Sequence, residues 1–520
     1  MKPIMYRDHL IVPADNRIAT MVPHARVFEQ DGQQMMLIPH KVDETQVLRN
    51  LGYDVRPPVM MNYHWPAPPD QPVFDAQRVT TALITTNKRS FVLNGLGTGK
   101  TRSALYAYDF LRKTEPNYGK LLITAPLSTL QQTWEREIMM LFPHFKTAIL
   151  HGSRQKRVDL LHSGADIFVI NHDGVETIFA ELKQRLAMFS MGILDELSIY
   201  KNSKTDMWKA TYAIVSEIDR VTGMTATPMT LAATDAYGQI KMLQPAALGG
   251  KSFGRFREDV QLKVSQFRWV NKRDAVDRVH KLMQPAVRFT RDECYDMPPC
   301  QYVERMTPMS KEQNKFFKAM SDECAVLSHN VVAVNAADQI NKLKQIAMGV
   351  VYDKDRNVIQ LDNAASLADL ETVIEQSNSK VIVFTPYKHS MHQLVTHLTQ
   401  RWTTQFVSGD VSPGMRNQIF TMFMQSPDPH VLVAHPECMS HGLTLTEAST
   451  IVWWGPPDSL ETYEQANGRI TRAGQKHSQL IVHMVRSKLE QLIFKLLGRR
   501  ANVQQQLLDM FENQDQGDLS

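Results

Sequence analysis

Two segments of the sequence carry residues whose types and spacing suit phosphate chemistry. The first, FVLNGLGTGKT over residues 91–101, is an apolar run followed by a glycine-rich turn. Glycines let backbone N–H groups converge on phosphate oxygens, a lysine at the end of the turn reaches the β- and γ-phosphates, and the next hydroxyl binds Mg²⁺. The strict pattern has glycine where this chain has Asn94. The segment predicts an ATP site made by Gly95, Gly97, Thr98, Gly99, Lys100 and Thr101.

The second segment, MGILDELSIYKN over residues 191–202, ends an apolar run in two adjacent carboxylates. Ligands of parallel sheets bind at the carboxyl ends of the strands, which is where Asp195 and Glu196 would lie. Asp195 is then expected to hold Mg²⁺ through water, and Glu196 to orient and deprotonate the water that attacks the γ-phosphate. A carboxylate pair on a solvated surface is the plain alternative, but the phosphate loop upstream favours the functional interpretation.

A third pattern lies far downstream, in YEQANGRITRAGQK over residues 463–476. It contains Gln465, Gly468, Arg469 and Arg472, and on a helix the two arginines share one face. Guanidinium groups are always charged and fork onto phosphate oxygens, so both can bind one anion. We interpret Arg469 and Arg472 as arginine fingers, which can raise a phosphoryl-transfer rate by about 10³–10⁵.

Composition limits the class of protein. The chain has 520 residues, is 43% hydrophobic and 22% charged, and has a formal net charge of +4, which is ordinary for folded domains. No apolar run approaches the ~18–20 residues that cross a bilayer, and the first residues lack the apolar region of a signal peptide. Its four cysteines form no CxxC pair. We therefore expect reduced thiols in a cytosol-like compartment, and no membrane partner.

Strand-length apolar runs alternate with helix-length amphipathic stretches over residues 74–237, and again after residue 378. This alternation predicts an α/β fold with two similar parallel-sheet units, each covered by helices. Between them, about residues 238–348 are expected to form helical insertions, and residues 251–291 carry eleven Lys or Arg against four Asp or Glu. Aromatic residues interrupt this basic run, which indicates either a nucleic-acid surface or a solvated helical insert with core aromatics.

The first 70 residues differ from the rest. Short strand-like runs around the hairpin signal Asp31–Gly32 predict a small α+β accessory domain, and the proline-rich residues 56–72 predict a linker. The expected domains are therefore 1–70, the accessory domain; 71–300, the first lobe with an insert from about 238; 301–495, the second lobe with an insert to about 348; and 496–520, a C-terminal helix and tail.

Together these motifs resemble helicase superfamily 2, and within it the Swi/Snf-type DNA translocases of compact phage or bacterial kind. Gln77 matches the adenine-reading glutamine of the family, and the remaining motifs follow in order at residues 95–101, 124–138, 195–196, 223–228, 381–386, 440–449 and 465–475. The family usually has Ala/Gly-His after the carboxylate pair, where this chain has Leu197 and Ser198. Coupling of the nucleotide to residues 223–228 must then run through other groups or be weaker.

The resemblance implies that the two parallel-sheet units are RecA-like lobes and that the protein works in the cytoplasm of a bacterial or phage-infected cell. It also implies an ATP- and Mg²⁺-dependent enzyme that moves on duplex, forked or branched DNA, which it contacts mainly through phosphates. Such contacts position a strand and do not read its sequence. The residues implied are Ser128, Thr129, Thr225, Thr385, Ser408, Ser440 and Thr444. A helix cap or a turn is the plain alternative for each of them, and Trp134, Trp453 and Trp454 are expected in the core.

Two other functions fit the same motifs. One is an RNA helicase of the same superfamily, against which the resemblance of residues 280–299 to the end of the Swi/Snf helical insert argues. The other is a nucleotide-gated clamp that binds DNA without productive hydrolysis. The intact Lys100, Glu196, Arg469 and Arg472 count against a clamp, whereas Leu197 and Ser198 keep it open.

Overall fold

The computed structural model describes residues 2–498 except 70, 230–231, 267, 295–297, 329–335, 353–356, 440–444 and 472–474. Side chains are likewise described except those of residues 321–328, 336–339 and 352. Within this part, the chain forms two compact units, residues 1–294 and residues 295–502. Each unit contains one parallel sheet, as the sequence predicts, and each is described by itself. The domain boundaries drawn from the sequence stay predictions.

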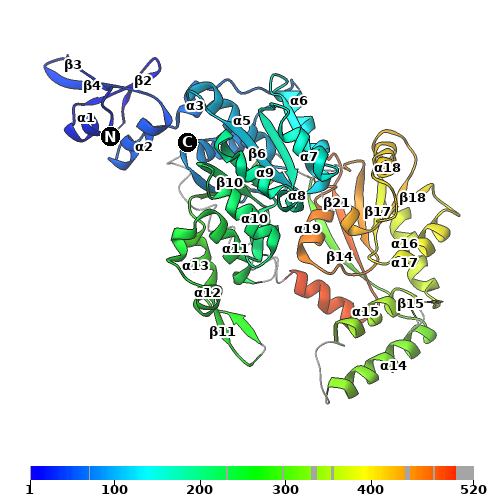
Figure 1. Ribbon diagram of the computed structural model, residues 1–520. Coiled ribbons are helices and arrows are strands. Elements are labelled where there is room, and N and C mark those ends of the chain that lie inside the picture. The colour runs from blue at the N-terminus through cyan, green and yellow to red at the C-terminus, as the bar shows by residue number, and fades with distance from the viewer. Residues whose placement is uncertain are drawn as a thin grey trace. The chain divides into compact units, whose positions relative to one another are not determined.

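The sheet of the first unit has seven strands in the order β13-β5-β10-β9-β6-β8-β7, all parallel (Figure 1). Its central strands are almost wholly apolar and buried, as expected for strands covered on both faces. The strands are β5 (Arg89–Val92), β6 (Lys120–Ala125), β7 (Thr147–Leu150), β8 (Ile167–Asn171), β9 (Phe189–Asp195), β10 (Arg220–Met224) and β13 (Ala286–Val287).

Helices cover both faces of this sheet, and two separate apolar cores lie beneath them. One core is built around α4 and α5, the other around α8 to α11 and α13. The helices are α4 (Asp75–Thr86), α5 (Lys100–Thr114), α6 (Arg136–Leu141), α7 (Arg154–Leu161), α8 (His172–Thr177), α9 (Phe179–Gln184), α10 (Asp206–Val215), α11 (Ala236–Leu243), α12 (Phe253–Val260) and α13 (Ala275–Leu282).

The sheet of the second unit has six parallel strands in the order β14-β21-β20-β17-β19-β18. These strands are β14 (Cys300–Met306), β17 (Lys380–Phe384), β18 (Thr404–Val407), β19 (Val431–Ala434), β20 (Ala448–Trp453) and β21 (Gln479–Val485). Around them lie α14 (Lys311–Ser328), α15 (Ala336–Ala347), the strand pair β15 (Val350–Tyr352) and β16 (Val358–Gln360), α16 (Ala364–Glu375), α17 (Lys388–Leu398), α18 (Pro413–Gln425), α19 (Leu460–Asn467) and a helix over residues 488–498. The predicted α/β class is confirmed.

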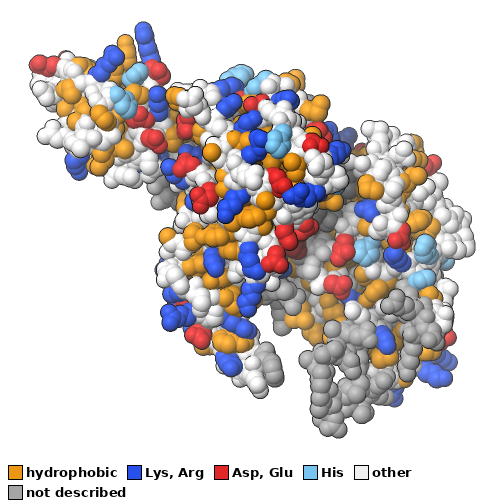
Figure 2. Space-filling view, viewed as in Figure 1, with side chains coloured by type: hydrophobic (Ala, Val, Ile, Leu, Met, Phe, Trp, Pro, Cys, Tyr) orange, Lys and Arg blue, Asp and Glu red, His pale blue; other side chains and the backbone are white. Residues whose placement is uncertain are grey.

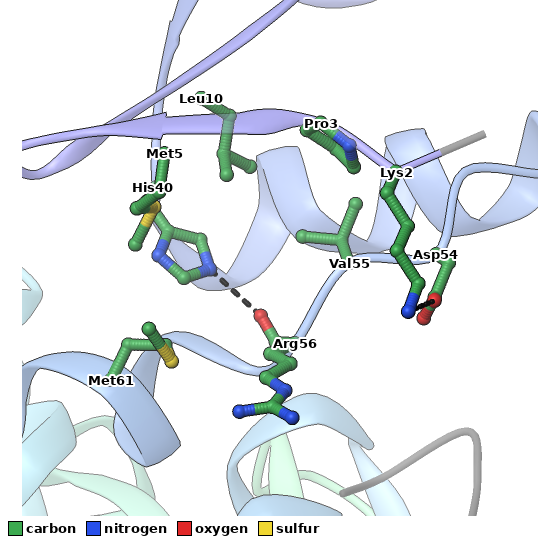
Figure 3. Close-up of a pocket in the computed structure, with 9 residues that line it drawn as sticks. All are labelled: Lys2, Pro3, Met5, Leu10, His40, Asp54, Val55, Arg56 and Met61. Carbon is green, nitrogen blue, oxygen red and sulfur yellow. Dashed lines mark hydrogen bonds and ion pairs between the residues drawn. The ribbon is translucent and has the colours of Figure 1, made fainter.

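The first 56 residues form a four-stranded antiparallel sheet in the order β1-β2-β4-β3, with two short helices. Asp31 and Gly32 both have positive φ, as their hairpin turn requires. A cavity of about 330 Å³ opens beside β1, where His40 Nε2 donates to the carbonyl oxygen of Arg56 at 2.7 Å (Figure 3). The elements are β1 (Ile4–Tyr6), β2 (His9–Pro13), α1 (Asn16–Met21), β3 (Arg26–Gln30), β4 (Gln33–Pro39) and α2 (Val42–Asn50).

The proline-rich segment is not a simple linker, so this prediction was wrong. Residues Pro58–Asn62 form the short helix α3, because proline is tolerated in the first turn of a helix. The aromatic residues that follow pack on the first lobe: the Tyr63 hydroxyl donates to Asp109 at 2.6 Å, and Trp65 meets Tyr106 edge to face. Asp109 belongs to α5, so the accessory domain is attached to the helix that follows the glycine loop.

The predicted helical insert of the first lobe also contains strands. Between α12 and α13 the chain forms an antiparallel hairpin, β11 (Gln261–Lys263) and β12 (Trp269–Asn271). Phe256 is buried in the core, whereas Phe253 and Trp269 are partly exposed. The aromatic residues of the basic run therefore divide between core and surface.

In the part of the chain that the structure describes, no helix has both the length and the apolar character needed to span a bilayer. Cys294, Cys300 and Cys438 are free thiols. Trp134, Trp453 and Trp454 are fully buried, which confirms their predicted place in the core.

Gly238→Ala should destabilise the first lobe. Gly238 lies in α11, where a methyl group would overlap the backbone carbonyl oxygens of Tyr200 and Lys201. Crowding of this kind costs about 1–3 kcal/mol. Gly254→Ala in α12 is the matched control, since its nearest atom is 3.9 Å away and alanine favours a helix. Thermal unfolding compares the two, and equal Tm values would contradict the packing argument.

Candidate nucleotide site

The glycine loop joins β5 to α5 in the first lobe. Gly97 and Gly99 have φ of +82° and +79°, a region that favours glycine. The Lys100 ammonium donates to the carbonyl oxygens of Asn94 and Gly95, at 2.9 Å each. The predicted phosphate lysine is therefore folded onto the loop itself.

Asn94, which departs from the strict glycine pattern, is buried and uses both ends of its amide. Its Nδ2 donates to the Thr80 hydroxyl at 2.8 Å, and its Oδ1 accepts from the Phe289 N–H at 3.0 Å. The side chain thus ties the base of the loop to α4 on one side and to the segment after β13 on the other. Asn94, which stands where the strict pattern has glycine, therefore adds two side-chain hydrogen bonds that a glycine could not make.

Gln77 lies directly against the loop. Its Oε1 accepts from the Phe74 N–H at 3.0 Å, while its amide packs on Gly99 so closely that a Cβ there would overlap it. Gly99 is consequently required both by its positive φ and by this contact. The structure brings the glutamine and the loop together, and the adenine-reading role of Gln77 stays a prediction.

The carboxylate pair lies at the end of β9. The Asp195 side chain accepts from Trp134 Nε1 at 3.0 Å and from the Glu196 N–H at 3.1 Å. Burial, and then the neighbouring Glu196 carboxylate, raise the pKa of Asp195 to about 6, and the Trp134 donor and the Lys100 ammonium only partly oppose this. A buried anion of this kind is stabilised by a cation.

Glu196 has a positive φ of 53°, which is rare for a non-glycine residue and indicates local strain. Its Oε1 accepts from two hydroxyls, Ser198 Oγ at 3.0 Å and Thr225 Oγ1 at 2.9 Å. Among the described residues none donates to Oε2. Thr225 follows β10, so the carboxylate is connected directly to residues 223–228, with Ser198 in place of the usual histidine.

The sequence analysis missed one residue of this site, His172, at the end of β8. Its Nε2 donates to the Asp195 carbonyl oxygen at 2.8 Å. Burial lowers the pKa of His172 to about 4, so the ring is neutral at physiological pH. Its only sequence signal is a histidine directly after a strand of the parallel sheet.

Of the predicted residues in the second unit, Gln465 lies on α19 and Gly468 directly follows it. Gln465 Nε2 donates to Glu461 at 3.3 Å, and Arg469 is only 1% exposed. Arg472 lies outside the described residues, so the pairing of the two arginines stays a prediction.

Most of the predicted strand-contact residues are buried. Of the five that the structure describes, only Ser128 is exposed, and the Thr129 hydroxyl donates to the Pro126 carbonyl oxygen at 2.9 Å. The Thr225 hydroxyl donates to Glu196. Thr385 and Ser408 are both buried, at 0% and 5% exposed. Ser440 and Thr444 lie outside the described residues. In this arrangement, phosphate contact through the hydroxyls of Thr129, Thr225, Thr385 and Ser408 would require rearrangement.

The residues present fit a Mg²⁺ ion bound chiefly through a nucleotide. Mg²⁺ keeps several waters and takes one or two carboxylates together with phosphate oxygens. Asp195 offers the buried carboxylate, and Thr101 lies in the first turn of α5 beside the glycine loop. Within the described ranges, no three His, Cys, Asp or Glu side chains gather as a metal site built from protein ligands alone.

Two family models match the chain, one within each compact unit. The DEAD/DEAH box helicase model covers residues 74–234, and the helicase conserved C-terminal domain model covers residues 362–474. The first match contains the glycine loop, the carboxylate pair and Thr225, and the second contains Gln465 and Arg469. A DEAD/DEAH box domain followed by a helicase C-terminal domain defines a superfamily 2 helicase core.

Several proteins are similar to this chain over most of its length. Protein p41 of Acyrthosiphon pisum secondary endosymbiont phage 1 is 25% identical, over 81% of this chain and 95% of its own length. The human DNA annealing helicase and endonuclease ZRANB3 is 23% identical over 80% of this chain. The Drosophila melanogaster SWI/SNF-related matrix-associated actin-dependent regulator of chromatin subfamily A-like protein 1 is 22% identical, also over 80%. The chain belongs by its two matched domains to the superfamily 2 helicases, and it is similar to the SWI/SNF-related protein of the fly.

The chain spans 38% of the human relative and 53% of the fly relative. Among solved structures, the Sulfolobus solfataricus SWI2/SNF2 ATPase core in complex with dsDNA matches 86% of this chain and 96% of its own chain. The identity is 19% and the TM-score 0.40.

Asp195→Asn should stabilise the metal-free protein at pH 7.5. A pKa raised from 3.8 to about 6 means that the folded state disfavours the charged carboxylate, a penalty of about 3 kcal/mol above pH 6. Losing one hydrogen bond offsets about 1 kcal/mol, which leaves a gain of about 1–2 kcal/mol.

The pH dependence of the stability gain tests whether it comes from the charge penalty on Asp195. Because the penalty disappears as pH falls from about 6 towards 3.8, the gain should shrink by about 1 kcal/mol at pH 5. Unfolding of wild type and variant in EDTA at both pH values measures it. Exposed Asp173→Asn, the control, should stay within about 0.5 kcal/mol. An equal effect at both pH values would show that Asp195 carries no such penalty.

Proposed function

We propose that the chain is an ATP-dependent DNA translocase or helicase, acting in a bacterial or phage-infected cytoplasm and coupling ATP hydrolysis to movement along duplex or branched DNA. The observation that carries the proposal is the Glu196 carboxylate. It is fixed by two hydroxyls through Oε1, it lies beside Asp195, and among the described residues no donor engages Oε2. That oxygen is suited to accept a proton from a positioned water.

The other residues take roles that their chemistry supports. We assign Lys100 and the loop N–H groups to the β- and γ-phosphates, and Gln77 to the adenine. Asp195 and Thr101 would hold Mg²⁺, which when bound neutralises charge on the phosphates. Arg469 and Arg472 would act as arginine fingers, with Gln465 and Gly468 beside them.

Coupling would pass through Thr225. Its hydroxyl contacts Glu196, and its N–H donates to the Val92 carbonyl oxygen at the end of β5, where the glycine loop begins. A change in the phosphates is thus transmitted to the segment after β10 through two direct hydrogen bonds. Ser198 adds a second hydroxyl to the same oxygen, which supports productive hydrolysis over a nucleotide-gated clamp.

Glu196→Gln should abolish ATP turnover and leave ATP binding intact, because the amide keeps the shape of the side chain but cannot take a proton. Lys100→Ala should instead weaken ATP binding itself, and exposed Glu176→Gln is the matched control. Phosphate release and nucleotide-binding titrations separate the three variants. Normal hydrolysis by Glu196→Gln would refute the assignment of the base, and a wild-type protein that binds ATP without hydrolysing it would be a clamp.

Duplex or forked DNA should stimulate the ATPase more than duplex RNA of the same sequence. The relatives named above support DNA, since ZRANB3 is a DNA annealing helicase and the fly protein is SWI/SNF-related. The measurement is phosphate release with each nucleic acid at matched, stated salt, because phosphate-backbone binding falls steeply with ionic strength. Greater stimulation by RNA would instead identify an RNA helicase.

A further inference from the structure

The β11–β12 hairpin presents an uncovered aliphatic surface on the first lobe. Leu262, Val264 and Val270 are 57%, 61% and 45% exposed. Leu262 pairs with Val270 across the strands, and Val264 lies two residues after Leu262, so all three share one face of the hairpin. Large aliphatic side chains gathered on one exposed face usually mark a binding surface.

Cations lie along the insert that carries this aliphatic face, and Lys263, which pairs with Trp269, lies on the opposite face of the hairpin. Residues 251–282 carry nine Lys or Arg and only four Asp or Glu. Two of these acids are already paired, Asp259 with Lys251 and Asp274 with Arg278, each at 2.7 Å. In contrast, Lys263, Arg268 and Arg273 are exposed and have no acidic partner among the described residues. Figure 2 shows basic and hydrophobic side chains side by side in this region, over α12, α13 and β11.

The opposite face of the hairpin is occupied and holds the strands in place. Arg257 stacks over the Trp269 ring at 4.2 Å from its centroid. At the base of the hairpin, the Asn271 Oδ1 accepts from Gln261 Nε2 at 3.0 Å and from the Ala233 N–H at 3.4 Å. The aliphatic face therefore projects from a braced hairpin.

This base lies close in sequence to the nucleotide site. Ala233 follows the segment 223–228, five residues after its end, and Thr225 in that segment contacts Glu196. The hairpin is thus hydrogen-bonded to the chain segment that follows Thr225, the residue whose hydroxyl contacts Glu196.

We propose that the β11–β12 hairpin is a DNA-junction wedge. Leu262, Val264 and Val270 meet base pairs at the boundary between single- and double-stranded DNA, while Lys263, Arg268 and Arg273 bind the flanking phosphates. Aliphatic side chains insert at base steps in this way, and unpaired cations supply the complementary charge. The inference rests on the proposed function only in taking DNA as the partner, since the surface itself takes no part in hydrolysis.

The test is binding to forked DNA, without ATP, that carries 2-aminopurine at the first base pair of the duplex. The wild-type protein should unstack that base and brighten its fluorescence. Leu262→Ser with Val270→Ser should abolish the brightening and weaken fork binding at least fivefold, with blunt-duplex binding changed less than twofold. Met139→Ser, an exposed apolar position on α6 of the same lobe, is the matched control.

The role of the three cations in phosphate binding is tested by the salt dependence of fork binding. Lys263→Gln, Arg268→Gln and Arg273→Gln combined should lower the slope of log Kd against log salt by about 2.7, since each phosphate contact contributes about 0.9. Exposed Lys156, Lys183 and Lys204 of the same lobe, changed to Gln together, serve as the control and should leave the slope unchanged.

The outcomes separate this inference from the proposed function. Hairpin variants that bind and brighten like wild type overturn the wedge even if DNA stimulates the ATPase, and would reassign the surface to a protein partner. A wild-type protein that fails to brighten the fork overturns it as well. If the brightening requires the hairpin but the protein hydrolyses no ATP, the result supports the wedge and refutes the proposed ATP-dependent translocase.

Discussion

Two adjacent carboxylates at the end of one buried strand constrain the whole first lobe. Asp195 and Glu196 are half-buried neighbours of like charge, and both carboxylates accept hydrogen bonds from surrounding groups. The donors come from four parts of the fold: an indole from the short π-helix Leu130–Glu135 before α6, a hydroxyl after β10, a hydroxyl from residue 198, and a backbone N–H. The order of strands in the parallel sheet is what brings these groups together.

Local patterns predicted the parts of the protein that local forces determine. The strands follow from apolar runs, and the glycine loop follows from its own residues, since Gly99 is required by its positive φ. The DG turn of the accessory domain is similarly local. Each of these features depends on a few neighbouring residues, which the sequence displays directly.

Features that depend on contacts between distant residues could not be predicted. Trp134 was expected in the core and lies there, but its hydrogen bond to Asp195 joins residues 61 positions apart. The proline-rich segment was taken for a linker because the aromatic contacts of Tyr63 with α5 are invisible in its composition. The predicted phosphate-contacting hydroxyls, such as Thr225, were placed by motif position alone, which does not reveal that a hydroxyl already has a partner inside the lobe.

The insert of the first lobe leaves and rejoins the sheet at neighbouring places. It departs after β10, and it returns as β13, which pairs with β5, while the Gly95 N–H donates to the Phe289 carbonyl oxygen and the Phe289 N–H donates to Asn94. Both ends are thus fastened beside the same loop. An excursion with such closely spaced ends can lengthen, shorten or change its surface without disturbing the sheet, so a different binding surface can be carried on the same nucleotide-site scaffold.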